Sequence, residues 1–279
     1  MPATCADTGG DRQRKEKTGM YHFFVEANQI DTDAHKVLIS GSDYNHIRNV
    51  LRMHPGEEIS VSCADKNEYR CEIAEFTDDA VLCNLLFVKE ADVESPVYSV
   101  LYQGIPKGDK METIVQKCVE LGVSEIVPVS CSRCVVKLDE KKAAAKVARW
   151  QGIAEAAAKQ SKRAVIPKVG MPLSMKAAVS QAKDADFKMI PYELAEGAEQ
   201  TREIFESLRT AAAQTSDARR TLAIFIGPEG GFSEEEVKLA DENGIVPVTL
   251  GKRILRTETA GMVVLAWVNY VLEMYGTKE

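Results

Sequence analysis

The chain has 279 residues, of which 45% are hydrophobic and 28% charged, a balance typical of a globular protein with room for two modest domains. Its formal net charge of -7 excludes a strongly basic nucleic-acid-binding protein, so any nucleic-acid contact has to use a local basic patch. Seven scattered cysteines without an upstream secretory segment indicate reduced thiols in the cytoplasm. No apolar run reaches membrane-spanning length, so we expect no membrane partner.

The N-terminal part reads as a polar extension followed by short strands. Residues 1–19 lack apolar periodicity, and we expect them to be a disordered extension. Five segments rich in Val, Ile, Phe, Tyr and Cys then predict a small β-barrel or sandwich over residues 20–92, with strands at 21–26, 36–40, 58–64, 69–75 and 80–88. One helix, 43–53, interrupts them, with Asp43 as its N-cap.

The pattern changes at an acidic stretch, residues 90–96, which ends in Ser-Pro and predicts a linker. Beyond it, over residues 96–279, strand and helix signals alternate, which predicts a mostly parallel sheet with helices on both faces. The predicted strands are 97–104, 125–131, 165–169, 186–192, 222–226 and 246–250. The predicted helices are 110–121, 139–159, 173–182, 202–212, 234–243 and 258–274.

Two glycine-rich segments follow strands at the edge where such sheets bind ligands. Residues 227–231 (GPEGG) precede a capping box that Ser233 and Glu236 form, and residues 250–260 (LGKRILRTETA) follow the next strand. Glycine permits positive φ and close approach of the main chain to a ligand. A tight turn alone needs fewer residues than 227–231, so the pair indicates a small-molecule pocket built from main chain. Neither segment carries a dinucleotide or nucleoside-triphosphate fingerprint.

Two charged residues accompany the second segment. Glu258 lies at the predicted start of a helix, where the helix dipole favours a carboxylate whatever its task. Arg256 lies two residues earlier and cannot stack beside Glu258 on a helix, so we expect it to point elsewhere, toward a substrate. Taken alone the two would be a structural ion pair, but their place beside the glycine segment favours a functional site.

One segment, residues 130–168, carries a local excess of positive charge, with ten Lys and Arg against three acids. It is a candidate phosphate-binding surface, although a solvated helix face explains several of its lysines. That alternative is weaker past the helix end, at Gln160, Lys162 and Arg163. The first predicted helix offers His46, Arg48 and Arg52, for which RNA phosphate contact and solvated charge are equally good interpretations.

Cys131 and Cys134 form a C-x-x-C pair, but no second pair or nearby histidine completes a metal site. All four histidines lie before residue 55. We therefore expect no metal.

Several of these motifs together resemble the RsmE family of ribosomal RNA uridine-N3 methyltransferases, which belongs to the SPOUT superfamily. The resemblance rests on residues 227–233 (GPEGGFS) and 250–260, and on four shorter segments in family order: 46–52 (HIRNVLR), 107–112 (KGDKME), 120–123 (ELGV) and 155–163 (EAAAKQSKR). It runs from about Met20 to the C-terminus, which leaves residues 1–19 as an addition.

The resemblance implies a PUA-like β-barrel followed by a SPOUT-type α/β domain with a C-terminal trefoil knot, and a homodimer formed through the knot region. It implies that S-adenosyl-L-methionine (AdoMet) binds in the knot, and that the substrate is 16S rRNA in the small ribosomal subunit. The cofactor-binding residues carried over are Ile226, Gly227, Glu229, Gly230, Gly231, Leu250, Gly251, Ile254, Leu255 and Arg256.

The implied reaction moves a methyl group to N3 of a uridine, so we expect Arg256 and Glu258 to be catalytic. Arg256 would stabilise charge on the uracil oxygens, and Glu258 would accept the N3 proton or orient Arg256. The alternatives are a SPOUT methyltransferase for another RNA site, a non-catalytic RNA-binding ribosome assembly factor and, more distantly, a nucleotide-dependent oxidoreductase.

Overall fold

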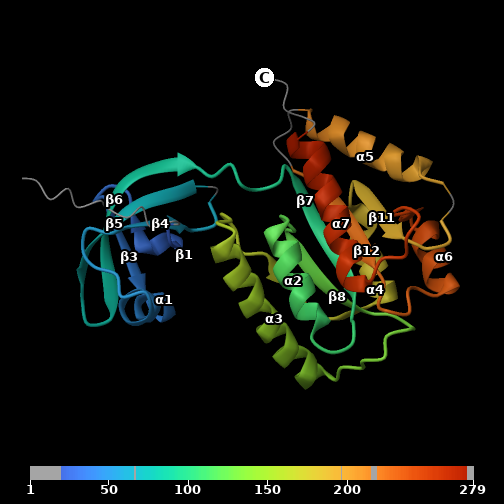
Figure 1. Ribbon diagram of the computed structural model, residues 1–279, viewed down its shortest axis with the longest axis horizontal. Coiled ribbons are helices and arrows are strands. Elements are labelled where there is room, and N and C mark those ends of the chain that lie inside the picture. The colour runs from blue at the N-terminus through green and yellow to red at the C-terminus, as the bar shows by residue number, and fades with distance from the viewer. Residues whose placement is uncertain (1–19, 66, 196, 215–218, 275–279) are drawn as a thin grey trace, which may run out of the picture.

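The computed structural model describes residues 20–65, 67–195, 197–214 and 219–274, so the predicted extension 1–19 lies outside the described residues. An N-terminal curled sheet is followed by a larger mixed α/β part with a parallel sheet (Figure 1). This is the predicted fold class. Within the described ranges, no helix is both long and apolar enough to cross a membrane.

The N-terminal sheet has six strands in the order β1-β4-β5-β6-β3-β2, antiparallel except where β1 runs parallel to β4. They are β1 (His22–Phe24), β2 (Ile30–Asp31), β3 (Lys36–Ser40), β4 (Glu58–Ser62), β5 (Asn67–Phe76) and β6 (Ala80–Glu90), with the 3-10 turn η1 (Ala27–Gln29) before β2. Side chains of β3 alternate between exposed and buried, which places Val37 and Ile39 in the core. This alternation is the period-two pattern from which the strands were predicted.

The predicted helix 43–53 is shorter and less regular than expected. It consists of α1 (Ser42–Asn45) and a π-helical turn, η2 (His46–Val50). Gly41, not Asp43, occupies the N-cap position, so that part of the prediction is wrong. The Asp43 carboxylate instead accepts a hydrogen bond of 2.7 Å from Nζ of Lys159, which belongs to the second part of the chain.

The parallel sheet has the order β10-β8-β7-β12-β11-β13, with β9 also paired to β8. Its strands are β7 (Val97–Gly104), β8 (Glu125–Ser130), β9 (Lys168–Val169), β10 (Leu173–Ser174), β11 (Phe187–Pro191), β12 (Arg220–Ile226) and β13 (Val246–Val248). The helices are α2 (Lys110–Glu120), α3 (Glu140–Gln160), α4 (Met175–Gln181), α5 (Glu199–Ala212), α6 (Glu234–Glu242) and α7 (Thr257–Asn269), with short turns η3 (Ala182–Asp184) and η4 (Tyr270–Met274).

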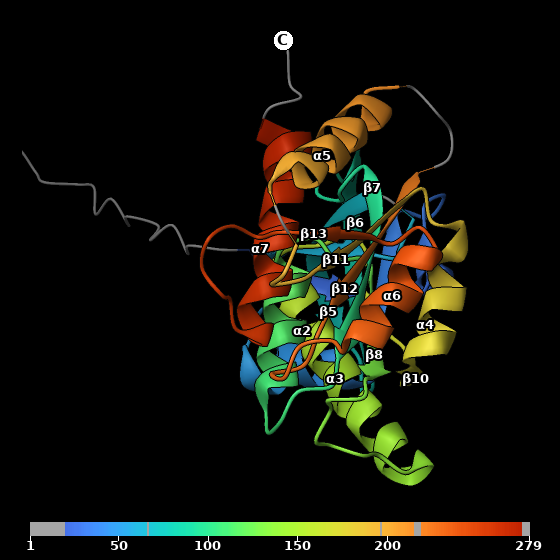
Figure 2. The same ribbon diagram turned by 90° about the vertical axis from the view of Figure 1, so that its right-hand side faces the viewer.

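Helices cover both faces of this sheet, as the alternating pattern predicted. One apolar core joins the sheet to α2, α5 and α7, with α3 packed on α2, and a second core joins it to α4 and α6. Figure 2 shows α4 and α6 on one side of the strands and α2 and α7 on the other. The carboxyl ends of β11, β12 and β13 are thereby held between two helical layers.

Two predicted elements of the α/β part begin two or more residues later than expected. Of the strand predicted at 165–169, only β9 pairs with the sheet, because the main chain of Ala164 and Val165 donates hydrogen bonds to Glu94 instead. The helix predicted at 173–182 starts two residues later, since Ser174 pairs in β10 and then caps α4 through its hydroxyl.

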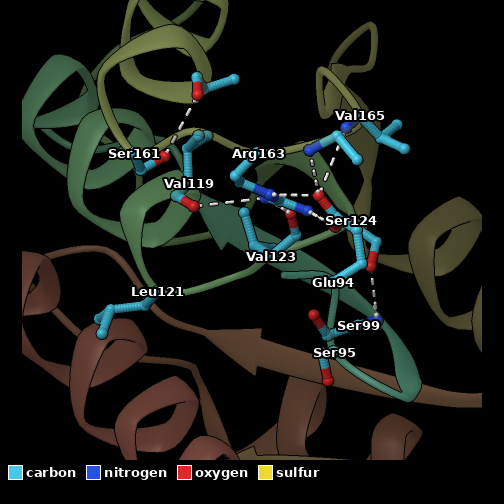
Figure 3. A network of polar contacts seen from close by, with 12 residues as sticks. Glu94, Ser95, Ser99, Val119, Leu121, Val123, Ser124, Ser161, Arg163 and Val165 are labelled. Carbon is cyan, nitrogen blue, oxygen red and sulfur yellow. Dashed lines mark hydrogen bonds and ion pairs between the residues drawn. The ribbon is translucent and has the colours of Figure 1, made fainter. Parts of the chain in front are cut away.

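The segment predicted as a linker is anchored to the α/β part. Ser95 is buried, and the Glu94 carboxylate forms an ion pair with Arg163, whose guanidinium also donates hydrogen bonds to the carbonyls of Val119 and Val123 (Figure 3). We call Asp43, Glu94, Lys159 and Arg163 the junction. One ion pair joins Asp43 of the N-terminal part to Lys159 of α3. The other joins Glu94 of the connecting segment to Arg163, three positions past the end of α3.

Candidate active site

The two glycine segments line one pocket at the carboxyl edge of the parallel sheet. Its volume is about 700 Å³, and we call it the glycine pocket. All ten side chains or main-chain positions predicted to bind the cofactor line it: Ile226, Gly227, Glu229, Gly230, Gly231, Leu250, Gly251, Ile254, Leu255 and Arg256. Segments about twenty residues apart in the sequence thus form one surface.

The first glycine loop is shaped by its main chain. Gly231 has a φ of +67° and Gly251, in the second loop, a φ of +103°, conformations that residues with a Cβ rarely adopt. A Cβ on Gly227 would lie 3.1 Å from the main chain of Gly231. After the loop, Ser233 and Glu236 form the predicted capping box at the start of α6. The loop therefore ends on a fixed helix.

The carboxyl end of β7 packs against the first glycine loop. Gly104 lies so close to it that a Cβ there would come within 2.6 Å of Pro228. Gln103, which is fully buried, donates hydrogen bonds from Nε2 to the Gly104 carbonyl and, at 2.9 Å, to Oγ1 of Thr257. The Thr257 hydroxyl in turn donates to the Gly227 carbonyl at 2.6 Å. One buried threonine thus connects the two glycine loops.

Four charged side chains lie together at the glycine pocket: Lys110, Glu229 and Arg256 line it, and Glu258 lies beside them. Nζ of Lys110 is 2.9 Å from Oε1 of Glu229 and 3.7 Å from Oε2 of Glu258. The hydrogen bond to Glu229 is the main cause that raises the pKa of Lys110, and nearby Arg256 opposes this rise. Burial alone would raise the pKa of Glu229, but hydrogen bonds from Lys110 and the main-chain N–H of Lys107 hold it below its ordinary value.

Glu258 does not line the pocket, unlike Arg256. Its Oε2 atom is buried without a hydrogen-bond partner among the described residues, with Lys110 as a neighbouring cation. The carboxylate therefore retains a free acceptor beside the pocket wall.

Several pocket residues were not found from the sequence. Tyr192 and Glu193 follow β11, and Lys110 and Arg133 come from the start of α2 and the loop after β8. Tyr192 stands at the carboxyl end of a predicted strand, which is a usable signal. Lys110 lies in segment 107–112, which contributes to the resemblance, but nothing local assigns Lys110, Arg133 or Glu193 to this pocket.

The C-x-x-C segment packs against the glycine pocket. Between its cysteines, Arg133 donates a 2.9 Å hydrogen bond to the Gly230 carbonyl, and the Ser132 N–H donates to the buried Glu236 carboxylate at 2.7 Å. A hydrogen bond from Cys131 lowers the pKa of the Cys134 thiol to about 7. Among the described residues, no group of three or more potential ligands is arranged to hold a metal.

The residues predicted to bind RNA fall into different environments. His46, Arg52, Gln160 and Lys162 are exposed. Arg48 is exposed as well, but its guanidinium donates to the Tyr44 hydroxyl and the Thr77 carbonyl and lies over the rings of Tyr44 and Phe76.

Arg163 is the exception, and its predicted role is wrong. The residue is 4% exposed, and its guanidinium is used by Glu94 and two carbonyls of the chain itself. A cation in this position holds the junction together, and at 4% exposure it is largely closed to a phosphate.

Comparisons with known proteins agree with the resemblance. The sequence matches the RNA methyltransferase domain family over residues 93–269 and the RNA methyltransferase PUA domain family over residues 39–86. A curated relative, ribosomal RNA small subunit methyltransferase E of Bacillus subtilis, is 36% identical over 91% of this chain and 98% of its own length.

Solved structures give the same result. The methyltransferase E of Neisseria gonorrhoeae, bound to S-adenosyl methionine, is 30% identical with a TM-score of 0.75 and covers 91% of this chain and 98% of its own. A Legionella pneumophila protein described as a putative methyltransferase with bound cofactor SAM is also 30% identical, with a TM-score of 0.75, over 90% of this chain and 97% of its own. The chain therefore belongs to the RsmE family of ribosomal RNA small subunit methyltransferases.

Proposed function

We propose that the protein methylates N3 of one uridine in 16S rRNA, with AdoMet as the methyl donor, and that it acts in the cytoplasm on the assembled small subunit. The observation that carries the proposal is the glycine pocket, a cavity of about 700 Å³ that both glycine segments line. This volume lies within the range of small-molecule and cofactor sites.

The residues of the pocket suit AdoMet. The main chains of Gly227 and Gly231 approach so closely that a Cβ on Gly227 would lie 3.1 Å from Gly231, and the pocket face of this loop is main chain that can approach an adenine edge. Ile226, Leu250 and Leu255 supply apolar walls, and Glu229 supplies negative charge near the sulfonium-bearing ligand. We propose that these residues hold the cofactor.

When bound, AdoMet supplies an activated methyl group, so the protein's main task is alignment of donor and acceptor. Arg256 lines the pocket at the start of α7 and is placed to stabilise negative charge on the uracil oxygens. Glu258 lies outside the pocket lining, and its Oε2 is buried without a hydrogen-bond partner among the described residues, so we propose that it orients Arg256, with acceptance of the N3 proton as the alternative. Lys110 keeps a positive charge beside both acids.

RNA recognition would come from outside the pocket. The exposed side chains of His46, Arg52, Gln160 and Lys162 are suited to grip RNA by shape and phosphate contact. Their modest charge fits an assembled ribosomal particle better than free RNA, because the particle adds its own shape to recognition. We also propose the trefoil knot and the homodimer that the resemblance implies.

The test is transfer of labelled methyl from AdoMet to small ribosomal subunits that lack rRNA modification, followed by identification of the labelled nucleoside. We expect 3-methyluridine at one site, at least about 100-fold less product with Arg256→Ala, and a weaker reaction on naked 16S rRNA. Transfer to another nucleoside would refute the N3 assignment. AdoMet binding without any transfer would support the non-catalytic assembly factor.

A further inference from the structure

The junction connects two segments that were predicted separately to touch RNA. Asp43 lies three positions before His46, and Lys159 lies one position before Gln160 and three before Lys162. Their ion pair, at 2.7 Å, joins α1 of the N-terminal part to the end of α3. Side-chain exposure is 13% for Asp43 and 29% for Lys159, so the pair is largely shielded from solvent and salt.

The neighbourhood makes this contact a fixed one. β1 packs against α3, and Phe24 of β1 reaches the apolar core of the α/β part. The ring of His46 lies edge-on to Phe23, also in β1, at 6.3 Å between centroids. Figure 1 shows the carboxyl end of α3 beside β1, whereas α6 lies at the far end of the α/β part. The two RNA-facing segments therefore share one support.

Two exposed cations, Arg52 in the N-terminal part and Lys162 after α3, have unusual backbone conformations. Arg52 and Lys162 have φ angles of +52° and +57°, the left-handed region that side chains other than glycine rarely adopt. Neither side chain forms a hydrogen bond or ion pair with the part of the chain that the structure describes. At Lys162 this conformation ends α3, where the N–H of Arg163 donates to the carbonyl of Ala158 at 3.0 Å, so the chain direction there is fixed by the helix end.

We propose that Asp43 and Lys159 are positioning residues, whose ion pair holds the η2 segment and the end of α3 in register as one composite surface for the phosphates of folded RNA. The proposal rests on the proposed function and adds the device that aligns its RNA contacts. The pair acts through its neighbours. Asp43 itself would repel RNA.

This role can be separated from a plain charge effect. Asp43→Lys adds positive charge to the surface, so simple electrostatics predicts tighter RNA binding. If the pair positions the surface, the same substitution places two ammonium groups against each other and weakens binding. The matched control is Glu242→Lys on the exposed face of α6, which makes the same charge change far from the junction.

The experiment measures the dissociation constant for 16S rRNA and for small subunits, together with KM and kcat of methyl transfer, for the full chain. We expect Asp43→Lys and Lys159→Asp each to weaken RNA binding and raise the KM for RNA roughly fivefold, as the loss of about 1 kcal/mol implies. AdoMet affinity and kcat should stay unchanged. The double variant, which restores the pair in reverse, should recover most of the loss, and Glu242→Lys should show none.

Equal or tighter RNA binding by Asp43→Lys would overturn the proposal, as would a double variant no better than Lys159→Asp. Thermal melting of each variant, with the milder Asp43→Asn, separates misfolding from misplacement. A folded Asp43→Asn that binds RNA as tightly as the parent also overturns it. Failure of the parent protein to bind any small-subunit RNA would instead refute the proposed function, and this inference with it.

Discussion

The glycine pocket and the cationic segment that leads into the junction were both singled out from short motifs, yet only at the pocket does every predicted binding residue line the expected surface. At the pocket, the motif is a statement about main chain, because glycine is required wherever a Cβ would collide. At the junction, the motif was a run of cations, and a cation is compatible with solvent, RNA or a buried carboxylate. Arg163 pairs with the carboxylate of Glu94, whose side chain is 12% exposed. Main-chain requirements locate a site more securely than side-chain charge does.

The largest expected effect tests the junction side of this comparison. Arg163→Ala should lower the free energy of unfolding by about 3–5 kcal/mol, because it leaves the largely shielded carboxylate of Glu94 without a counter-charge. Denaturant unfolding measures this. Lys162→Ala, one position away and exposed, should unfold like the parent and weaken RNA binding instead. If Arg163→Ala proved as stable as Lys162→Ala, the buried role would be wrong.

At the pocket, Gly104→Ala should move the first glycine loop, because the new Cβ would lie 2.6 Å from Pro228. We expect a cost of about 1–3 kcal/mol in stability and at least roughly tenfold weaker AdoMet binding, measured by calorimetry. Gly152→Ala in α3 is the matched control, since its Cβ meets nothing within 4 Å. Parent-like AdoMet affinity in Gly104→Ala would show that the loop tolerates displacement.

A similar cost in stability, with a smaller loss of AdoMet affinity, is expected where the two glycine loops are connected. Thr257→Val keeps the shape of the side chain and removes the hydroxyl shared by Gln103 and Gly227. Leaving these buried groups without a partner should cost about 1–3 kcal/mol and weaken AdoMet binding. Thr257→Ser should retain most of both, and a loss as large as that of the valine variant would argue against the hydrogen bonds.

The smallest effect concerns pH. The folded protein holds the pKa of Glu229 below that of the unfolded chain, so its contribution to stability is complete above about pH 5 and is lost as the pH falls through the lowered value. Glu229→Gln removes this contribution, which we put at about 0.5 kcal/mol for a partly exposed pair. The stability difference between parent and variant should therefore narrow between pH 7 and pH 4. A constant difference would mean that Glu229 acts by shape alone.

The sequence predicted the order of strands and helices well, since period-two and helical patterns are local. β7 has the bounds that its apolar run predicted, and α6 starts at the predicted capping box. The sequence could not show that Glu94, in an apparent linker, would bind the side chain of Arg163, 69 positions away. Nor could it place Lys110 or Arg133 at the pocket, because their positions depend on how separate elements pack. The domain limits predicted at residues 92 and 96 stay predictions.

From the length of helix α2 we expect a minimum size for an efficient substrate. Its first residue, Lys110, lines the glycine pocket, and the carbonyl of Val119 near its other end is bound by Arg163 at the junction. At 1.5 Å per residue these points lie about 14 Å apart along the helix axis. A mononucleotide or dinucleotide in the pocket would therefore end short of Lys162 and the η2 segment. Turnover should rise steeply only once the RNA is long enough, or folded enough, to cover that length.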